Sequence, residues 1–266
     1  MLTWPWPVDV MARRGASYRQ ILSFYFPNVH VGNDSARDNA ALGTAQAEAI
    51  RVSGTSRLLA PLQPVSGRLT LSSEHIRVTY PSETERAEIE KVLNVLESTR
   101  NDLSSRLALA SLTLSEPSQL QVAIHETTQN FVAATGQSWW IAAVTRGWRI
   151  RLQPLRVLRQ FERLTSTLRH EYTHAVIEVL SRGQAARWLT EGLALHVAGE
   201  AGMFSHSARI TELPLDELEH RLASPVSRED MRALYAAAYQ RVRGLITAES
   251  EASVWRQVAG RWKGKE

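Results

Sequence analysis

The feature that most constrains the fold of this chain is a long helical pattern that a glycine interrupts. Between about residues 155 and 182, apolar side chains recur with the period of an α-helix, namely Val157, Phe161, Leu164, Leu168, Tyr172, Val176 and Val179. Gly183 is a typical helix end, because glycine readily adopts the left-handed conformation found there. A second helical pattern covers residues 186–198. A turn at Gly183 would fold this second helix back on the first.

Two histidines share one face of the first helix. His170 and His174 are four residues apart in the segment "RHEYTH", a spacing that places two side chains one above the other, about 6 Å apart along the axis. Their imidazole nitrogens could bind one metal ion, and Glu171, at the edge of the same face, could hold a water beside that ion as a general base. The alternative for so short a motif is a chance pair of exposed histidines.

The second helix offers a third ligand. Glu191 follows His174 by 17 residues, and the turn at Gly183 would bring its carboxylate across to the histidines. The chain has no cysteine, which excludes disulfides and thiolate ligands and leaves His, Asp and Glu to hold any metal. A catalytic zinc site uses three protein ligands, so His170, His174 and Glu191 form a candidate set for Zn²⁺. The neighbours of this acid are apolar, which argues against simple solvation: Trp188, Leu189, Leu193 and Leu195.

The remaining patterns predict an α+β fold in which strands come first and helices follow. The expected elements are strands at 69–71 and 76–80, a helix at 83–107, a strand at 120–125, a short helix at 126–136, a hairpin at 138–154, and helices at 227–246 and 248–262. The hairpin has its turn at Arg146 and Gly147.

The segments "HEYTH" and "RWLTEGLA" together resemble the gluzincin metallopeptidases, in particular the small peptidase-MA-like domains. In this family the third zinc ligand is the glutamate of a Trp-Leu-x-Glu-Gly-x-Ala segment at about this distance. The similarity covers roughly residues 66–260 and includes the stretches "EHIRVTYPSETERAEIEKVLNVLE", "LQVAIHETTQNFVAATG", "GWRIRLQP" and "LYAAAYQRVRGLI".

This resemblance implies both a fold and an activity. The fold would be zincin-like, with a small mixed sheet whose edge strand lies over the active-site helix, followed by a helical C-terminal half. The resemblance implies that His170, His174 and Glu191 bind Zn²⁺ and that Glu171 is the general base. The chain would then hydrolyse peptide bonds in a peptide or protein substrate.

One position departs from the family pattern, and two further features receive a role only from the resemblance. Thermolysin-type relatives carry an acid four residues after the third ligand, where it orients a zinc-binding histidine, whereas this chain has Leu195 there. The family often uses a tyrosine or histidine to stabilise the oxyanion, and Tyr239 aligns best with it, with Tyr235 a turn earlier. Residues 147–154, "GWRIRLQP", fit the edge strand along the substrate cleft. The alternative for these residues is an ordinary edge strand whose arginines protect it against pairing with other chains.

The N-terminal part of the chain carries a second, shorter resemblance. Residues 8–31 include "MARRGASYRQILSFYFPNVHV" and are similar to the closing segment of stage II sporulation protein D-like domains, a family of peptidoglycan lytic transglycosylases. We therefore expect residues 1–31 to be a remnant or tail of such a domain, 32–65 a linker and 66–262 the metallopeptidase domain. The rest of that domain is missing, so no transglycosylase activity is carried over. The resemblance implies a piece of a longer bacterial protein near the cell envelope or periplasm, with the cell wall as a further candidate partner.

Charge and composition narrow the remaining functions. The net charge is +4, but no nucleic-acid recognition motif accompanies it, so no nucleic-acid partner is expected. No apolar run approaches the roughly 18 residues that a membrane span needs. Two alternatives to a peptidase stay open: a non-catalytic cell-wall-associated module that keeps the zincin fold, and a basic binding protein with a fortuitous histidine pair. The sequence leaves the oligomeric state open.

Overall fold

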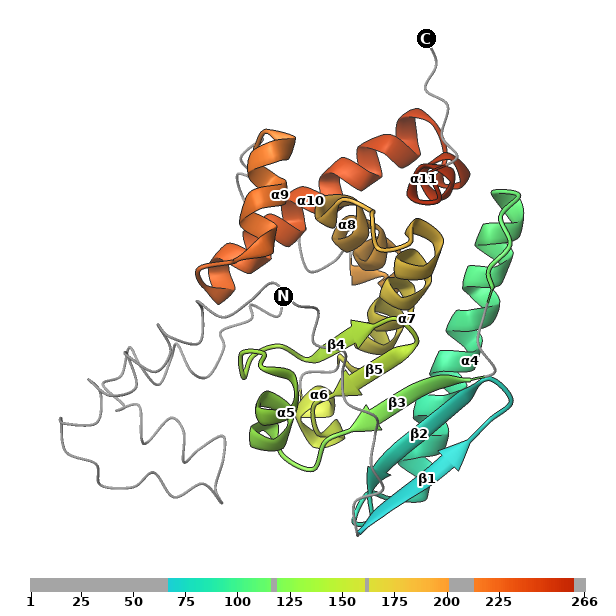
Figure 1. Cartoon of the computed structure of the whole chain (residues 1–266), viewed down its shortest axis with the longest axis vertical. Coiled ribbons are helices and arrows are strands. Elements are labelled where there is room, and N and C mark those ends of the chain that lie inside the picture. The colour runs from blue at the N-terminus through green and yellow to red at the C-terminus, as the bar shows by residue number, and fades with distance from the viewer. Residues whose placement is uncertain (1–66, 116–118, 161–162, 201–212, 261–266) are drawn as a thin grey trace, which may run out of the picture. The chain divides into compact units, whose positions relative to one another are not determined.

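The computed structural model describes residues 67–115, 119–160, 163–200 and 213–260. Their fold is α+β, as predicted, with a five-stranded mixed sheet followed by a helical C-terminal half (Figure 1). The sporulation-D-like segment and the linker predicted for residues 1–31 and 32–65 lie outside the described residues, as do the last residues of the helix predicted at 248–262.

The sheet has the strand order β1-β2-β3-β5-β4. β1 (Arg68–Ser72) pairs antiparallel with β2 (Ile76–Pro81), which runs parallel to β3 (Leu120–Ile124). β3 in turn runs parallel to β5 (Arg149–Leu152), and β4 (Ala143–Arg146) pairs antiparallel with β5. Strands therefore form where the alternating apolar patterns predicted them.

Alternation gives the sheet one apolar and one polar face. Most of the apolar face is buried, including Ile76, Val78, Leu120, Val122, Ile124, Ile150 and Leu152. Helix α4 (Arg86–Leu109) packs on this face with the stripe that its sequence predicted: Ile89, Val92, Leu93, Leu96 and Leu103. The polar face carries arginines instead, because each strand alternates its side chains between the two sides.

The helical pattern of residues 155–182 forms two helices, so the prediction of one continuous helix was wrong. α6 (Leu155–Gln160) follows Pro154, and α7 (Leu164–Ser181) begins after its own N-cap residue, Arg163. Both helices bury apolar side chains in the same core, among them Leu158 and Leu168. The apolar period therefore runs through both helices and does not reveal where α7 begins.

The glycine turn after α7 forms as predicted. Arg182 and Gly183 have left-handed φ values of 55° and 71°. The Gly183 N–H donates to the Glu178 carbonyl at 2.8 Å, which satisfies a carbonyl in the last turn of α7. Helix α8 (Arg187–Ala198) then folds back and packs against α7. The helical hairpin expected from the sequence is thus present.

Further helices enclose α8 and the sheet. α5 (Thr128–Thr135) lies by β5, and α10 (Arg228–Ala248) covers α8 and contacts α11 (Glu251–Val258). α9 (Leu215–Ala223) was missed by the sequence reading. Within the described residues, none of the helices combines the length and the apolar character that crossing a membrane requires.

The edge of the sheet differs from the prediction. β4, not β5, is the edge strand next to α7, and β5 lies inside the sheet between β3 and β4. The assignment of residues 147–154 to the edge strand was therefore wrong. The alternation of the second arm shows which of its side chains face the core, but it does not reveal which arm pairs with β3.

Candidate metal centre

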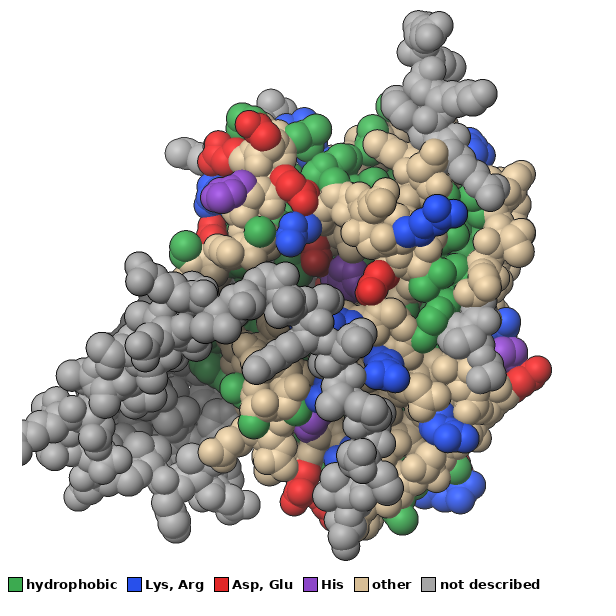
Figure 2. Space-filling view, viewed as in Figure 1, with side chains coloured by type: hydrophobic (Ala, Val, Ile, Leu, Met, Phe, Trp, Pro, Cys, Tyr) green, Lys and Arg blue, Asp and Glu red, His purple; other side chains and the backbone are tan. Residues whose placement is uncertain are grey.

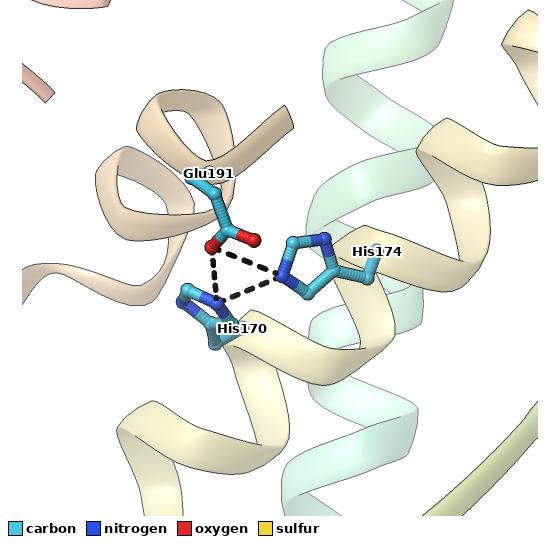
Figure 3. Close-up of side chains that lie close together, drawn as sticks. All are labelled: His170, His174 and Glu191. Atoms are coloured by element: carbon cyan, nitrogen blue, oxygen red, sulfur yellow. Dashed lines mark hydrogen bonds and ion pairs between the residues drawn. The ribbon is translucent and has the colours of Figure 1, made fainter. Parts of the chain in front are cut away.

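Helix α7 brings the two predicted histidines together. His170 and His174 lie one turn apart, and their Nε2 atoms approach to 2.9 Å (Figure 3). The rings meet edge-on, with centroids 4.6 Å apart and an interplanar angle of 74°. Both side chains are largely buried, with 11% and 18% of their surface exposed, so solvent reaches them only in part. Two imidazoles with converging Nε2 atoms are suited to bind one cation.

Glu191 on α8 completes the group. Its Oε2 lies 3.4 Å from His170 Nε2 and 3.5 Å from His174 Nε2 (Figure 3). One ligand atom from each of the three residues falls within 4.8 Å of the others, so the group can hold a metal ion. Among the described residues, Glu191 Oε2 is buried without a hydrogen-bond partner of good geometry. A buried, unsatisfied carboxylate oxygen aimed between two imidazole nitrogens fits a bound cation.

The acid reaches this position because α8 and α10 approach closely beside it. A Cβ atom on Gly192 would lie 2.4 Å from the Ala238 carbonyl oxygen and 2.5 Å from Val242 Cγ2. Only glycine permits such an approach without displacing a helix. The glycine that follows Glu191 therefore sets the depth at which this side chain enters the site.

A salt-bridged arginine ties α7 to the end of α8. Arg169, one residue before His170, donates from Nε and Nη2 to the Val197 carbonyl at 3.0 and 2.8 Å. Its Nη2 also donates to Asp102 of α4 at 2.8 Å. The two helices that carry the ligands are thus held together by backbone and side-chain hydrogen bonds outside the site itself.

The charges in the site are strongly coupled. Burial alone would lower the pKa of His170, but the close contact with the Glu191 carboxylate and its negative charge outweigh it and raise that pKa to about 9. Burial likewise disfavours the ionised form of Glu191, yet the close contacts and charges of His174 and His170 hold its pKa well below the usual range. The site therefore favours positive charge, which a metal ion would supply in place of the proton.

Glu171 is held by the edge strand. The Thr145 hydroxyl of β4 donates to Glu171 Oε2 at 2.6 Å and lies 3.2 Å from the Glu171 carbonyl oxygen. Two turns along α7, Glu178 Oε2 accepts a hydrogen bond from the Gly147 N–H at 2.7 Å. The β4–β5 hairpin is therefore fastened to the helix through two carboxylates, of which the first is the predicted general base.

Thr145 is a site residue that the sequence reading missed. It pairs with Ile150, whose side chain faces the core, so the alternation of β4 turns Thr145 toward α7 as well. The sequence could have indicated Thr145 as a polar residue on the helix-facing side of the hairpin. It could not indicate which residue of α7 lies opposite Thr145, because that depends on the packing of the whole sheet.

Tyr235, rather than Tyr239, stands beside the imidazoles. Its ring stacks on that of His170, with centroids 6.3 Å apart and an interplanar angle of 20°. Burial, followed by the charges of Glu191 and Glu171, raises the pKa of Tyr235, so its phenol stays protonated as a hydrogen-bond donor. Tyr239, the predicted catalytic tyrosine, is buried against Leu195. Its catalytic role stays a prediction.

The site opens to one side of the molecule. Figure 2 shows a hollow between the sheet and the helices of the C-terminal half, with histidine and acidic side chains at its floor. Among the described residues, the histidines that were not predicted to be ligands do not belong to the metal group. His196, for example, contacts Glu251 at 3.3 Å, and His125 meets Phe131 edge-on.

Comparison with known proteins gives no family assignment. No protein-family model matches the chain, and no curated protein matches it either. The residues and their geometry therefore carry the functional conclusion.

Proposed function

We propose that this chain is a zinc-dependent peptidase of the gluzincin type. The observation that carries the proposal is the position of Glu171, whose carboxylate is buried next to the three-residue metal group and is fixed by the Thr145 hydroxyl. A structural zinc site is closed by four protein ligands, whereas a catalytic one has three and keeps a position open. A buried carboxylate beside three ligands supports the catalytic kind.

The donor set supports zinc as the ion. Two imidazoles and one carboxylate, without thiolate, form a set that catalytic zinc sites use. When bound, Zn²⁺ supplies Lewis acidity that polarises the scissile carbonyl and lowers the pKa of water. The arrangement of a mixed sheet over the helix that bears both histidines agrees with the zincin-like fold that the sequence resemblance implies.

Residues of the chain would carry out proton transfer, stabilise the developing negative charge and bind the substrate backbone. Thr145 engages Glu171 Oε2, so Oε1 is the atom that takes a proton from the attacking water and delivers it to the leaving amine. The Tyr235 phenol, whose ring stacks on His170 and which interacts with Glu191, is the candidate donor toward the oxygen that gains negative charge. The open side of β4 offers backbone groups with which an extended peptide can pair.

A second candidate is a non-catalytic module that keeps the fold and the metal. The observation that favours it is Leu195, which stands where thermolysin-type relatives have an acid. Leu195 is only 1% exposed and packs against Ala236 and Tyr239, so it offers no hydrogen bond to an imidazole. Outer hydrogen bonds of this kind tune metal affinity, and their loss weakens it by about 10- to 100-fold.

One experiment separates the two candidates. Zinc content and hydrolysis of a mixed peptide library are measured for the wild type, Glu171→Gln, His174→Ala and the surface control Glu90→Gln. We expect the wild type and the control to bind zinc and cleave peptides. Glu171→Gln should keep zinc and lose about 10²- to 10⁴-fold in rate, and His174→Ala should lose zinc. Zinc-loaded wild type without hydrolysis supports the non-catalytic module, and equal rates for wild type and Glu171→Gln refute the assigned base.

A further inference from the structure

The polar face of the sheet is an arginine surface. Strand alternation and register place all of the arginines of the five strands on this one face: Arg68, Arg77, Arg146, Arg149 and Arg151. No Asp or Glu occurs in the five strands of the described part of the chain. In the view of Figure 2, Lys and Arg side chains are visible over the sheet.

The exposed arginines of this face stand in a single cross-strand row. Register pairs Arg77 with Gln121, Gln121 with Arg149, and Arg149 with Arg146, so the row crosses β2, β3, β5 and β4 in turn. The side chains of Arg77, Arg149 and Arg146 are exposed, and Gln121 is half-buried. Neighbouring strands are about 4.8 Å apart, so the row is about 14 Å long. We call these four residues the arginine row.

The groups around the arginine row show that this face is electropositive. Burial, followed by the charge of Arg149, lowers the pKa of Arg151. Burial, followed by the charges of Arg151 and Arg68, lowers the pKa of His125 to about 4. Arg68 donates to the carbonyls of Thr79 and Ile124, and the carboxylates that act on it, Glu126 and Glu83, follow β3 and β2 and lie outside the row. A surface where like charges oppose one another attracts anionic groups.

We propose that the arginine row binds an acidic polypeptide segment. Guanidinium groups bind carboxylates through two parallel hydrogen bonds, which fixes direction as well as charge. An extended acidic chain presents carboxylates on one side about every 6.6 Å, so a short segment reaches all three exposed arginines. The row thus fits a linear partner of this chemistry.

Two other anionic partners fit the row less well. Proteins that bind single-stranded nucleic acid use aromatic side chains on which bases stack, and none of the residues in the row is aromatic. Recognition of an anionic membrane usually takes a cluster of about four to eight basic residues, whereas three arginines are exposed in this row. An acidic polypeptide needs neither feature.

The row ends on β4, the strand that also holds a residue of the candidate metal centre. Arg146 follows Thr145 directly, but the two side chains lie on opposite faces of the sheet, and the Thr145 hydroxyl, on the α7 side, holds the carboxylate of Glu171. A segment bound along the row would therefore leave it at the edge strand. That this segment belongs to a substrate rests on the peptidase function proposed above, whereas the binding itself does not.

The test measures binding to the metal-free chain, so it is independent of catalysis. A fluorescein-labelled peptide of about ten glutamates, long enough to span the row, is titrated with protein in EDTA, and its anisotropy is followed. The row variant is Arg77→Glu with Arg149→Glu. The control variant, Arg86→Glu with Arg243→Glu, has the same charge change on α4 and α10.

We expect the wild type to bind the peptide, with an affinity that falls between about 50 mM and about 300 mM salt. The row variant should bind at least about tenfold more weakly than the control variant. Thermal unfolding checks that both variants fold, and Arg77→Gln with Arg149→Gln replaces the row variant if it does not.

Two results would overturn the proposal. One is the absence of peptide binding by the wild type, or equal binding by the row and control variants. The other is a tighter, row-dependent binding of single-stranded DNA or of vesicles rich in phosphatidylglycerol, which would assign the surface to a different partner.

Discussion

Gly192 gives a direct test of how the third ligand is positioned. Replacing it with alanine adds a Cβ atom that would lie 2.4 Å from the Ala238 carbonyl oxygen and 2.5 Å from Val242 Cγ2. The first contact is with backbone, which cannot rotate away as a side chain can. To reach the 3.0 Å that real contacts of this kind require, α8 and α10 must separate locally by about 0.6 Å.

Two opposing effects set the change in stability for Gly192→Ala. Alanine is favoured over glycine within a helix by about 1 kcal/mol. Overpacking costs about 1–3 kcal/mol, and contact with a rigid carbonyl puts this site near the upper end. The net loss is about 2 kcal/mol in the free energy of unfolding, or about 4–8 °C in Tm for a domain of this size.

The same displacement should weaken metal binding. Glu191 precedes Gly192, so a shift of α8 moves this ligand, and a metal site tolerates about 0.5 Å of misplacement. Thermal unfolding of the metal-free chain and zinc competition against a chelator measure the two effects. Gly244→Ala is the matched control, because a Cβ there meets nothing within 4 Å and it lies within α10. If Gly192→Ala is as stable as Gly244→Ala and binds zinc like the wild type, the close approach does not position Glu191.

Three further predictions concern the edge strand, the metal and the α11 contact. Thr145→Val should lower the peptidase rate and cost about 1–3 kcal/mol in the free energy of unfolding, because the Glu171 carboxylate loses its hydrogen-bond donor. Thr145→Ser keeps the hydroxyl and should retain both the rate and the stability. Equal rates for the two variants would contradict this role of Thr145. Zinc at about 100 times its Kd should raise the unfolding free energy by about 2.7 kcal/mol, an increase that His174→Ala abolishes in chemical denaturation. Hydrogen bonds from His196, Arg106 and Trp255 overcome burial and lower the pKa of Glu251 to about 2. Its stabilisation is therefore complete above pH 4.5 and lost as the pH falls toward 2; after allowance for solvent screening it amounts to about 1–2 kcal/mol. Urea unfolding across this range should show a weaker pH dependence for Glu251→Gln than for the wild type.

The metal group was predictable from the sequence because its parts are local. His170 and His174 follow from helical periodicity, and the glycine turn after α7 is a short-range signal that returns α8 to its partner. Glu191 then lies on the facing helix, and the structure brings its carboxylate to both imidazoles. Spacing along two helices and one turn therefore sufficed.

Features that depend on packing between distant elements were not predictable in the same way. Tyr235 and Tyr239 lie one turn apart on α10, so both fall on similar faces of this helix. The depth of α10 against α8, set at Gly192, decides that Tyr235 stacks on His170. The sequence resemblance favoured Tyr239 and contains no information about that depth. The catalytic role of Tyr239 stays a prediction.

The order of the hairpin arms was hidden for a related reason. Side-chain alternation in β5 shows which face is apolar, but it leaves open whether β4 or β5 pairs with β3. α9 has acidic residues in its first turn and basic residues in its last, which matches the helix dipole, yet it lacks a side-chain N-cap hydrogen bond. Tertiary contacts therefore decide the order of the hairpin strands and the formation of α9, for which the local sequence signals are weak.

The Arg169 contacts have a consequence for the choice of ion. This side chain closes the C-terminal end of α8 and is anchored by Asp102 of a third helix, so the spacing between the ligand-bearing helices is fixed by the scaffold. Such a frame fixes the distances between the ligand atoms and therefore the size of the ion that fits among them. Ions that need long bonds and six to eight oxygen ligands, such as Ca²⁺, would have to strain the helices to enter. Selectivity would then come from the stiffness of the frame as well as from the chemistry of its donors.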